Sequence, residues 1–236
     1  MIEDFKIERL SIVKKKTVNN DLGAIRRFFN LAIKRGYLDK NPMEKVEMLK
    51  ISDRRFPRFL TKEELERIYV KLKDEDRDII KVLANTGMRW GALRHLEWKD
   101  VDMENRIIKI REKILHTGKV WKPKAGSARD IPMDDVVYEI LKKRKRTEGF
   151  VFSKRDGKIL DRNNLRERLQ RVCRKLGIEN VNIHTLRHTF CSHLIMSGVD
   201  IPTMMKLSGH KDIRVAQMYM HLAKDHVRKA VERIKL

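Results

Sequence analysis

The residues best suited to chemistry lie between Asn182 and His221. This stretch supplies two imidazoles, one guanidinium and one phenol, from His184, His210, Arg187 and Tyr219. Imidazole and guanidinium groups donate hydrogen bonds and carry positive charge, and a phenol becomes a nucleophile once it loses its proton. This set of groups suits an anion better than a metal ion.

Helical spacing of apolar residues brings two of these groups together. His184 and Arg187 stand three positions apart, so on a helix both point from one face near its first turn. Gly198 ends this helix, and Pro202 stands at the start of a shorter one. The apolar positions that define the first helix are Leu186, Phe190, Leu194 and Ile195.

The other two candidates follow further along the chain. His210 lies in a Ser-Gly-His turn, where the absent side chain of Gly209 lets the backbone bend closely. Tyr219 comes nine positions later on an amphipathic segment. The competing tyrosines follow a glycine turn or fall on apolar helical faces typical of packing residues; they are Tyr37, Tyr69 and Tyr138.

Positive charge dominates the composition. The 236 residues include 55 Lys and Arg against 33 Asp and Glu, which gives a formal net charge of +22. Such a surplus favours a polyanion such as nucleic acid, through phosphate neutralisation and counterion release. The alternatives are a solvated basic surface like that of some thermophile proteins, a membrane surface or an acidic protein partner.

Composition also restricts the class of protein. Apolar residues make up 41% of the chain, which argues against a disordered tail. No run reaches the ~18 apolar residues that span a bilayer, and the first residues lack the apolar centre of a signal peptide. We therefore expect a cytoplasmic, nucleoid-associated protein in which Cys173 and Cys191 are reduced.

The pattern of apolar residues predicts a mainly α fold with a small antiparallel β-sheet (α+β). Residues 1–50 are expected to form a short helical domain, in which Thr17 caps a helix that ends at Gly36. Residues 51–58 are predicted to be a polar linker.

The second predicted domain spans residues 59–236. The residue pattern at Arg106–Arg111 and Ala128–Pro132 predicts two antiparallel strands. Phe150–Phe152 is predicted to be a further short strand. Ala223–Leu236 is predicted to be a final amphipathic helix. Expected helix starts, marked by a capping residue, are Thr61, Asp134 and Asp161.

Several motifs, taken in order, resemble those of the phage integrase family of tyrosine recombinases over residues 58–236. Thr86–Arg89 (TGMR) resembles the family's first arginine box, and His184–His188 (HTLRH) resembles its H-x-x-R box. Leu207–His210 (LSGH) resembles its L-G-H box, and Gln217–His221 (QMYMH) resembles its nucleophile box. Lys124, eight positions before Pro132, matches the family's hairpin lysine. The resemblance implies a tyrosine-recombinase catalytic domain preceded by part of a helical core-binding domain that lacks its front helices.

The resemblance also implies a function, a site-specific DNA recombinase or integrase of mobile elements. Such an enzyme cuts and rejoins DNA through a 3′-phosphotyrosyl intermediate and leaves a free 5′ hydroxyl. The implied partners are double-stranded DNA and three further copies in a homo-tetramer on DNA, with no metal, cofactor, membrane or small-molecule substrate. The alternatives are a type IB topoisomerase that relaxes DNA and a non-catalytic DNA-binding relic.

Physical chemistry assigns roles to the matched residues. Attack on a phosphodiester adds charge to its non-bridging oxygens, so catalysis consists largely of holding cations and donors there. A guanidinium is always charged and can bind two oxygens. A phenol with an ordinary pKa of ~10 needs a base, for which His184 is the candidate, and the departing 5′ oxygen needs an acid, for which Lys124 is the candidate. The expected catalytic residues are Arg89, Lys124, His184, Arg187, His210 and Tyr219.

Alternatives stand beside these roles. Lys122 is the alternative acid, and His184 can instead cap the helix that follows it. His188 and His193 share a helix with Cys191, which suggests zinc, but no carboxylate or second cysteine stands in register.

One position departs from the family pattern. Family members commonly carry an acidic residue three positions after the first arginine, and Ala92 occupies that position here. Glu97 or Asp100 is the candidate substitute that braces the site. The final helix, Ala223–Leu236, either passes to a neighbouring subunit or folds back on its own domain.

Overall fold

A computed structural model gives the fold and describes residues 2–51, 56–124, 128–144, 148–154 and 156–223. The chain forms two compact units, Met1–Arg55 and Phe56–Leu236. Among the described residues, no helix is long and apolar enough to cross a membrane. The predicted final helix falls on residues 223–236, which, except for Ala223, lie outside the described residues.

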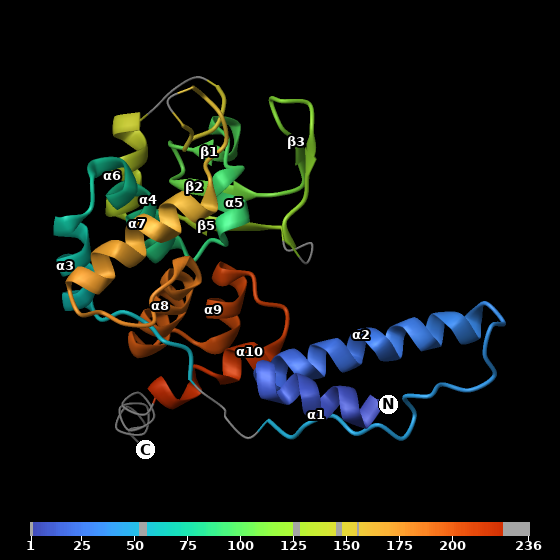
Figure 1. The fold of residues 1–236 in the computed structure, drawn as a ribbon. Helices are drawn as coiled ribbons and strands as arrows, with labels where there is room; N and C mark the ends of the chain where they lie inside the picture. The colour runs from blue at the N-terminus through green and yellow to red at the C-terminus, as the bar shows by residue number, and fades with distance from the viewer. Residues whose placement is uncertain (1, 52–55, 125–127, 145–147, 155, 224–236) are drawn as a thin grey trace, which may run out of the picture. The chain divides into compact units, whose positions relative to one another are not determined.

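The first unit consists of two helices and an extended segment. Helix α1 spans Ile2–Ile12 and α2 spans Lys15–Lys34 (Figure 1). Val18 and Leu22 of α2 are fully buried together with Met43, which lies in a turn after α2. This small apolar cluster, rather than a large core, holds the unit together.

The predicted cap of α2 at Thr17 is wrong. The helix begins at Lys15, after Lys14 in an extended conformation that makes no side-chain cap bond. The Thr17 amide already bonds to the Lys14 carbonyl at 2.8 Å, so Thr17 lies inside the first turn. Helix α1 ends at Ile12, and α2 begins directly after that break, at Lys15. The helix therefore starts two residues before Thr17, although threonine is the better capping residue. Gly36, with a φ of 75°, follows the end of the helix as predicted.

The second unit is mainly helical (Figure 1). The predicted helix starts are confirmed, because the side chains of Thr61, Asp134 and Asp161 accept hydrogen bonds from the amides of Glu64, Val137 and Asn163. Its helices are α3 (Lys62–Lys71), α4 (Asp74–Thr86), α5 (Trp90–Arg94), α6 (Asp135–Arg144), α7 (Arg162–Lys175), α8 (Ile183–Met196), α9 (Ile201–Ser208) and α10 (Ile213–Gln217), with the 3-10 helices η1 (Trp98–Asp100) and η3 (Met220–Ala223).

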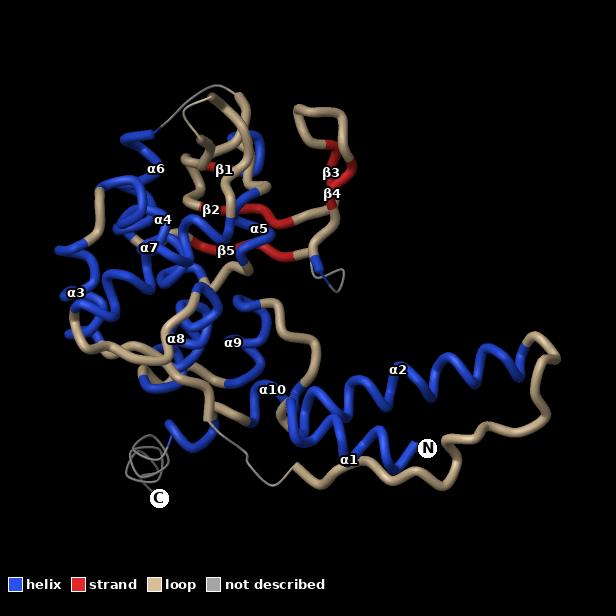
Figure 2. The backbone as a smooth tube through the Cα atoms, in the orientation of Figure 1, coloured by secondary structure: helices blue, strands red, loops and turns tan. Residues whose placement is uncertain are grey.

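A small antiparallel sheet has the strand order β1-β2-β5, and a separate hairpin is formed by β3 and β4 (Figure 2). Ile108 of β2 faces Ile131 of β5, and both are buried. This pair confirms the two predicted strands to within one residue at each end. The strands are β1 (Val101–Asp102), β2 (Ile107–Ile110), β3 (Lys113–Ile114), β4 (Val120–Trp121) and β5 (Arg129–Pro132).

The predicted strand at Phe150–Phe152 is wrong. Phe150 makes only an isolated bridge to Glu97, and the Val151 amide bonds to the Leu96 carbonyl at 2.9 Å. The segment runs beside the loop that follows α5 and not beside a sheet edge, so no ladder forms. Its apolar side chains are buried, which is why the pattern resembles a strand.

Helix α8 joins the two apolar clusters of the second unit. Its first half places Ile183 and Leu186 in the main core, and its second half places Cys191 and Ile195 in a smaller cluster with Tyr219. Helices α4 and α9 pack against it. A helix fixed on several sides in this way is a rigid support for the side chains of its first turns.

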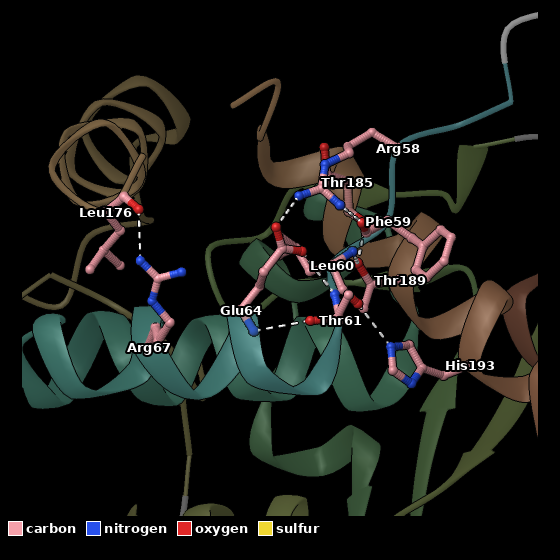
Figure 3. A network of polar contacts seen from close by, with 10 residues as sticks. All are labelled: Arg58, Phe59, Leu60, Thr61, Glu64, Arg67, Leu176, Thr185, Thr189 and His193. Carbon is pink, nitrogen blue, oxygen red and sulfur yellow. Dashed lines mark hydrogen bonds and ion pairs between the residues drawn. The ribbon is translucent and has the colours of Figure 1, made fainter. Parts of the chain in front are cut away.

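The chain that enters the second unit is also tied to α8 (Figure 3). The Leu60 amide donates to Thr189 Oγ1 at 2.9 Å, and the Leu60 carbonyl lies 2.8 Å from His193 Nε2. The capping box of α3 follows directly at Thr61. His193 therefore contributes to the packing of this entry segment.

Candidate active site

Arg187 is the most deeply buried charge of the site. Its side chain, in the second turn of α8, is 2% exposed. Nη1 donates to the Gly87 carbonyl at 2.7 Å and to the Ser208 carbonyl. Within the described residues, Nε and Nη2 have no hydrogen-bond partner. Burial, followed by the charge of Arg89, lowers the pKa of Arg187 to about 10, so the guanidinium stays charged at neutral pH.

Arg89 reaches the same place from the end of α4. Gly87 ends α4 with a φ of 60°, and a Cβ at this position would lie 2.3 Å from Phe190 Cδ1, so only glycine fits. Two residues later, Arg89 Nη2 donates to the Gly209 carbonyl at 3.2 Å. Arg89 and Arg187 thus converge on one turn, as the sequence predicts.

His210 follows that turn. Its Nδ1 lies 2.8 Å from Ser208 Oγ, and Ser208 Oγ lies 2.7 Å from the Met204 carbonyl. The hydroxyl has one hydrogen, and the carbonyl can only accept, so the hydroxyl accepts from His210 Nδ1–H. This assigns the tautomer and leaves Nε2 as the second ring position. Burial, followed by Arg187 and Arg89, lowers the pKa of His210 to about 3, so the ring is neutral.

His184 lies at the first turn of α8. The hypothesis that it caps this helix is wrong, because the Asn182 side chain accepts from the amides of His184 and Thr185. The His184 ring lies 4.6 Å from the His188 ring, edge to face. Partial burial, followed by the charges of Arg187, Arg89, Arg162 and Lys124, lowers the pKa of His184.

Lys124 is exposed and follows strand β4. Its charge is the smallest of the named contributions that lower the pKa of the His184 imidazole, after burial and three arginines. Lys122, the alternative acid, instead pairs with Glu112 across the hairpin at 2.8 Å. The structure therefore gives Lys122 a local partner.

Tyr219 is fully buried and turned toward α8. Its side chain is 0% exposed and packs with Cys191, Met204 and Ala216. Its Oη lies 2.5 Å from His188 Nδ1. Burial raises the pKa of the Tyr219 phenol well above its usual value, and Cys191 adds to this shift. The hydroxyl is thus protonated and out of reach of solvent.

The contact with His188 is the one that sequence reasoning missed. The sequence pattern suggests only a zinc role for His188, and in the described part of the chain no group of three or more His, Cys, Asp and Glu side chains could hold a metal. Burial, followed by His184 and Arg187, lowers the pKa of His188 to about 4, so this ring is neutral. His188 follows His184 by four positions, which places both rings on one face of α8. This spacing is the sequence signal that could have placed His188 in the site.

Glu97 and Asp100 do not brace the first arginine. Glu97 Oε1 accepts from the amide and from Nδ1 of His116, each at 2.6 Å. Asp100 pairs with Lys113 of the hairpin. Both carboxylates therefore hold the hairpin that leads to Lys124.

The chemistry of this arrangement follows from its charge. Two arginines and the neutral imidazole of His210 meet at the turn after α9, and within the described residues both guanidiniums donate to backbone carbonyls. A buried charge is costly unless it is paired, so an anion with several oxygens complements the free donors of Arg187. The site is a cluster of buried positive charge with unpaired donors on Arg187 among the described residues.

Comparison with known proteins identifies the family of this chain. The sequence model of the phage integrase family matches residues 58–226. The tyrosine recombinase XerC of Oceanobacillus iheyensis is 27% identical over 232 residues, covering 92% of this chain and 74% of that protein. The tyrosine recombinase XerD of Staphylococcus saprophyticus is 28% identical over 234 residues, covering 91% and 74%. This chain therefore belongs to the phage integrase family, and its enzyme class is that of the tyrosine recombinases.

A solved structure extends the similarity to three dimensions. The Tn1549 transposon integrase in complex with a circular intermediate DNA superposes with a TM-score of 0.79 at 25% identity, covering 99% of this chain and 84% of that chain. The predicted fold class, mainly α with small antiparallel sheets, is confirmed.

Proposed function

We propose that this protein is a site-specific DNA recombinase in which Tyr219 cuts and rejoins the strand. The observation that carries the proposal is the buried guanidinium of Arg187. Two carbonyls fix its Nη1, while its Nε and Nη2 have no partner among the described residues. A phosphate oxygen is the ligand that matches these two donors.

The proposed reaction is a transesterification. Tyr219 Oη attacks phosphorus and loses its proton to His184, while the bond from phosphorus to the 5′ oxygen breaks. Lys124 gives a proton to that oxygen. The phosphodiester bond is exchanged for a phosphotyrosyl bond, so a 5′ hydroxyl can reverse the step without a nucleotide.

The remaining groups stabilise the transition state. Arg89, Arg187 and His210 meet the charge that grows on the non-bridging oxygens. A bound phosphate would raise the pKa of His210, because its negative charge offsets the two arginines that depress it. In that state His210 Nε2 can carry the proton that it donates to the phosphate.

The nucleophile must move before it reacts. No substrate atom can touch Tyr219 Oη while the side chain is 0% exposed and its hydroxyl is bonded to His188. We propose that the segment of α10 and η3 shifts when DNA binds. These helices have five and four residues, so few hydrogen bonds oppose the shift.

The proposed partners follow from charge and from the relatives. The net charge of +22 supports binding to double-stranded DNA in the nucleoid, and the structurally similar Tn1549 integrase is in complex with DNA. We further propose a homo-tetramer on DNA, with residues 1–50 as part of a core-binding domain, 51–58 as a linker and 59–236 as the catalytic domain.

The test is covalent trapping. The protein is incubated with fragmented genomic DNA of its host without added metal; protein-linked fragments are recovered under denaturing conditions, and their ends are sequenced. A nicked duplex of the recovered sequence should then give an adduct with the wild type and none with Tyr219→Phe. DNA binding without an adduct would reject the recombinase, and relaxation of any supercoiled plasmid without sequence preference would assign a topoisomerase instead.

A further inference from the structure

Three successive carbonyls at the end of α9 are each bound by a different arginine. The Leu207 carbonyl accepts from Arg129 Nε at 2.9 Å. The Ser208 carbonyl accepts from Arg187 Nη1, and the Gly209 carbonyl accepts from Arg89 Nη2 at 3.2 Å. Two of these arginines belong to the proposed phosphate site, and the third belongs to strand β5.

The carbonyls at this place need partners. The last carbonyls of a helix have no partner within the helix and carry partial negative charge. Hydrogen bonds from charged donors are about twice as strong as neutral ones, and they are directional. Arginines on three elements therefore fix the backbone that leads directly into His210.

Arg129 is well suited to a fixed role. It is 9% exposed and is flanked by the β2–β5 ladder, in which Ile131 is buried. Burial, followed by the charge of Arg89, lowers its pKa to about 10, so it remains charged at neutral pH. Burying a third like charge beside two others is costly, and simple packing of β5 against α9 does not need it.

We propose that Arg129 is a positioning residue for the reaction: it holds the Leu207–Gly209 backbone so that the His210 imidazole faces the phosphate. This inference rests on the proposed function of the site. Arg129 acts through His210 and does not itself touch the reacting atoms. Arg129 also connects strand β5, which follows Lys124 in the chain, with the turn that leads to His210.

The test compares single-turnover cleavage of the nicked duplex at saturating protein. Arg129→Met keeps the length of the side chain and removes the donors, and Arg129→Lys restores one donor. Arg111→Met is the matched control, because Arg111 is an exposed residue that pairs with Asp130 beside Arg129. We expect the cleavage rate of Arg129→Met to fall at least ~10-fold, with its duplex affinity changed less than ~3-fold. Arg129→Lys should recover part of the rate, and the rate of Arg111→Met should stay within ~2-fold of wild type.

A double-mutant cycle with His210→Ala separates positioning from general stability. If Arg129 acts through His210, Arg129→Met should cost less than ~2-fold in the His210→Ala background. The same fold loss in both backgrounds, or an unchanged rate in Arg129→Met, would overturn the proposal. Thermal unfolding identifies a variant that does not fold, in which case Arg129→Lys is used in the cycle. A wild type that forms no adduct would instead reject the function.

Discussion

The hydroxyl of Tyr219 lies 2.5 Å from Nδ1 of His188, the residue that follows Arg187 of the proposed phosphate site. The proposed nucleophile is therefore held by the same helix as Arg187 while its side chain is fully buried. Burial raises the pKa of the phenol. In the proposed function, burial and this hydrogen bond keep the Tyr219 phenol unreactive until DNA binds.

Loss of the His188 hydrogen bond should lower stability. His188→Phe keeps a ring of similar size but leaves the buried Tyr219 hydroxyl without this partner, which should cost ~1–3 kcal/mol of unfolding free energy. His188→Asn places an amide where Nδ1 was and should keep most of the bond. Urea unfolding measures both. Equal losses in the two variants would show that the ring volume matters and the hydrogen bond does not.

Replacement of Arg187 should separate binding from catalysis. In Arg187→Met the donors to the phosphate are lost, and single-turnover cleavage should fall ~100- to 1,000-fold, as for a lost oxyanion donor. Duplex affinity, measured by gel shift, should change little because Arg187 is buried and is one of 55 Lys and Arg in the chain. Arg77→Met is the control, since Arg77 pairs with Asp74 at the start of α4. Normal cleavage by Arg187→Met would remove Arg187 from the site.

Lys124 and Lys122 can be told apart by the leaving group. Lys124→Ala should lose cleavage of an ordinary duplex but regain it with a duplex that has sulfur in place of the bridging 5′ oxygen, because a thiolate leaves without a proton. Lys122→Ala should cleave both duplexes normally, since Lys122 pairs with Glu112. The reverse pattern would make Lys122 the acid.

The neutral imidazole of His210 predicts a dependence of stability on pH. Its folded-state pKa is about 3, below the ~6.5 of an unfolded histidine. The unfolded state therefore takes up the proton first, and the free energy of unfolding falls as the pH falls from ~6.5 toward ~3, with no contribution from His210 above ~6.5.

His210→Asn tests this dependence. Its amide can replace Nδ1–H toward Ser208 but does not titrate. Urea unfolding between about pH 7.5 and about pH 5 should show a shallower slope for the variant than for the wild type, by less than ~1.4 kcal/mol per pH unit because the ring is only partly buried. Parallel slopes would contradict the depressed pKa.

Local features of the fold could be predicted from sequence. The capping residues Thr61 and Asp161 and the paired strands each depend on a few neighbouring residues, and the structure has them where the pattern places them. The strand predicted at Phe150–Phe152 is wrong, because burial against a loop produces the same apolar run of residues as burial in a sheet.

The long-range contacts of the site could not be predicted in the same way. Arg187 meets Gly87 across 100 positions, and Arg129 meets Leu207 across 78. The sequence motifs identified Arg187, whereas Arg129 reads as an ordinary strand residue next to an acidic one. The partner of Tyr219 depends on how the segment that leads into η3 packs on α8, and helical periodicity carries no information about that packing.

The most direct test of the account is to locate the covalent bond. Wild-type protein trapped on the nicked duplex is digested with nuclease and protease, and the peptide that retains a nucleotide is sequenced by mass spectrometry. The account predicts a 3′-phosphate linked to Tyr219 and to no other residue. A nucleotide on Tyr37, Tyr69 or Tyr138, or an adduct that persists in Tyr219→Phe, would contradict it.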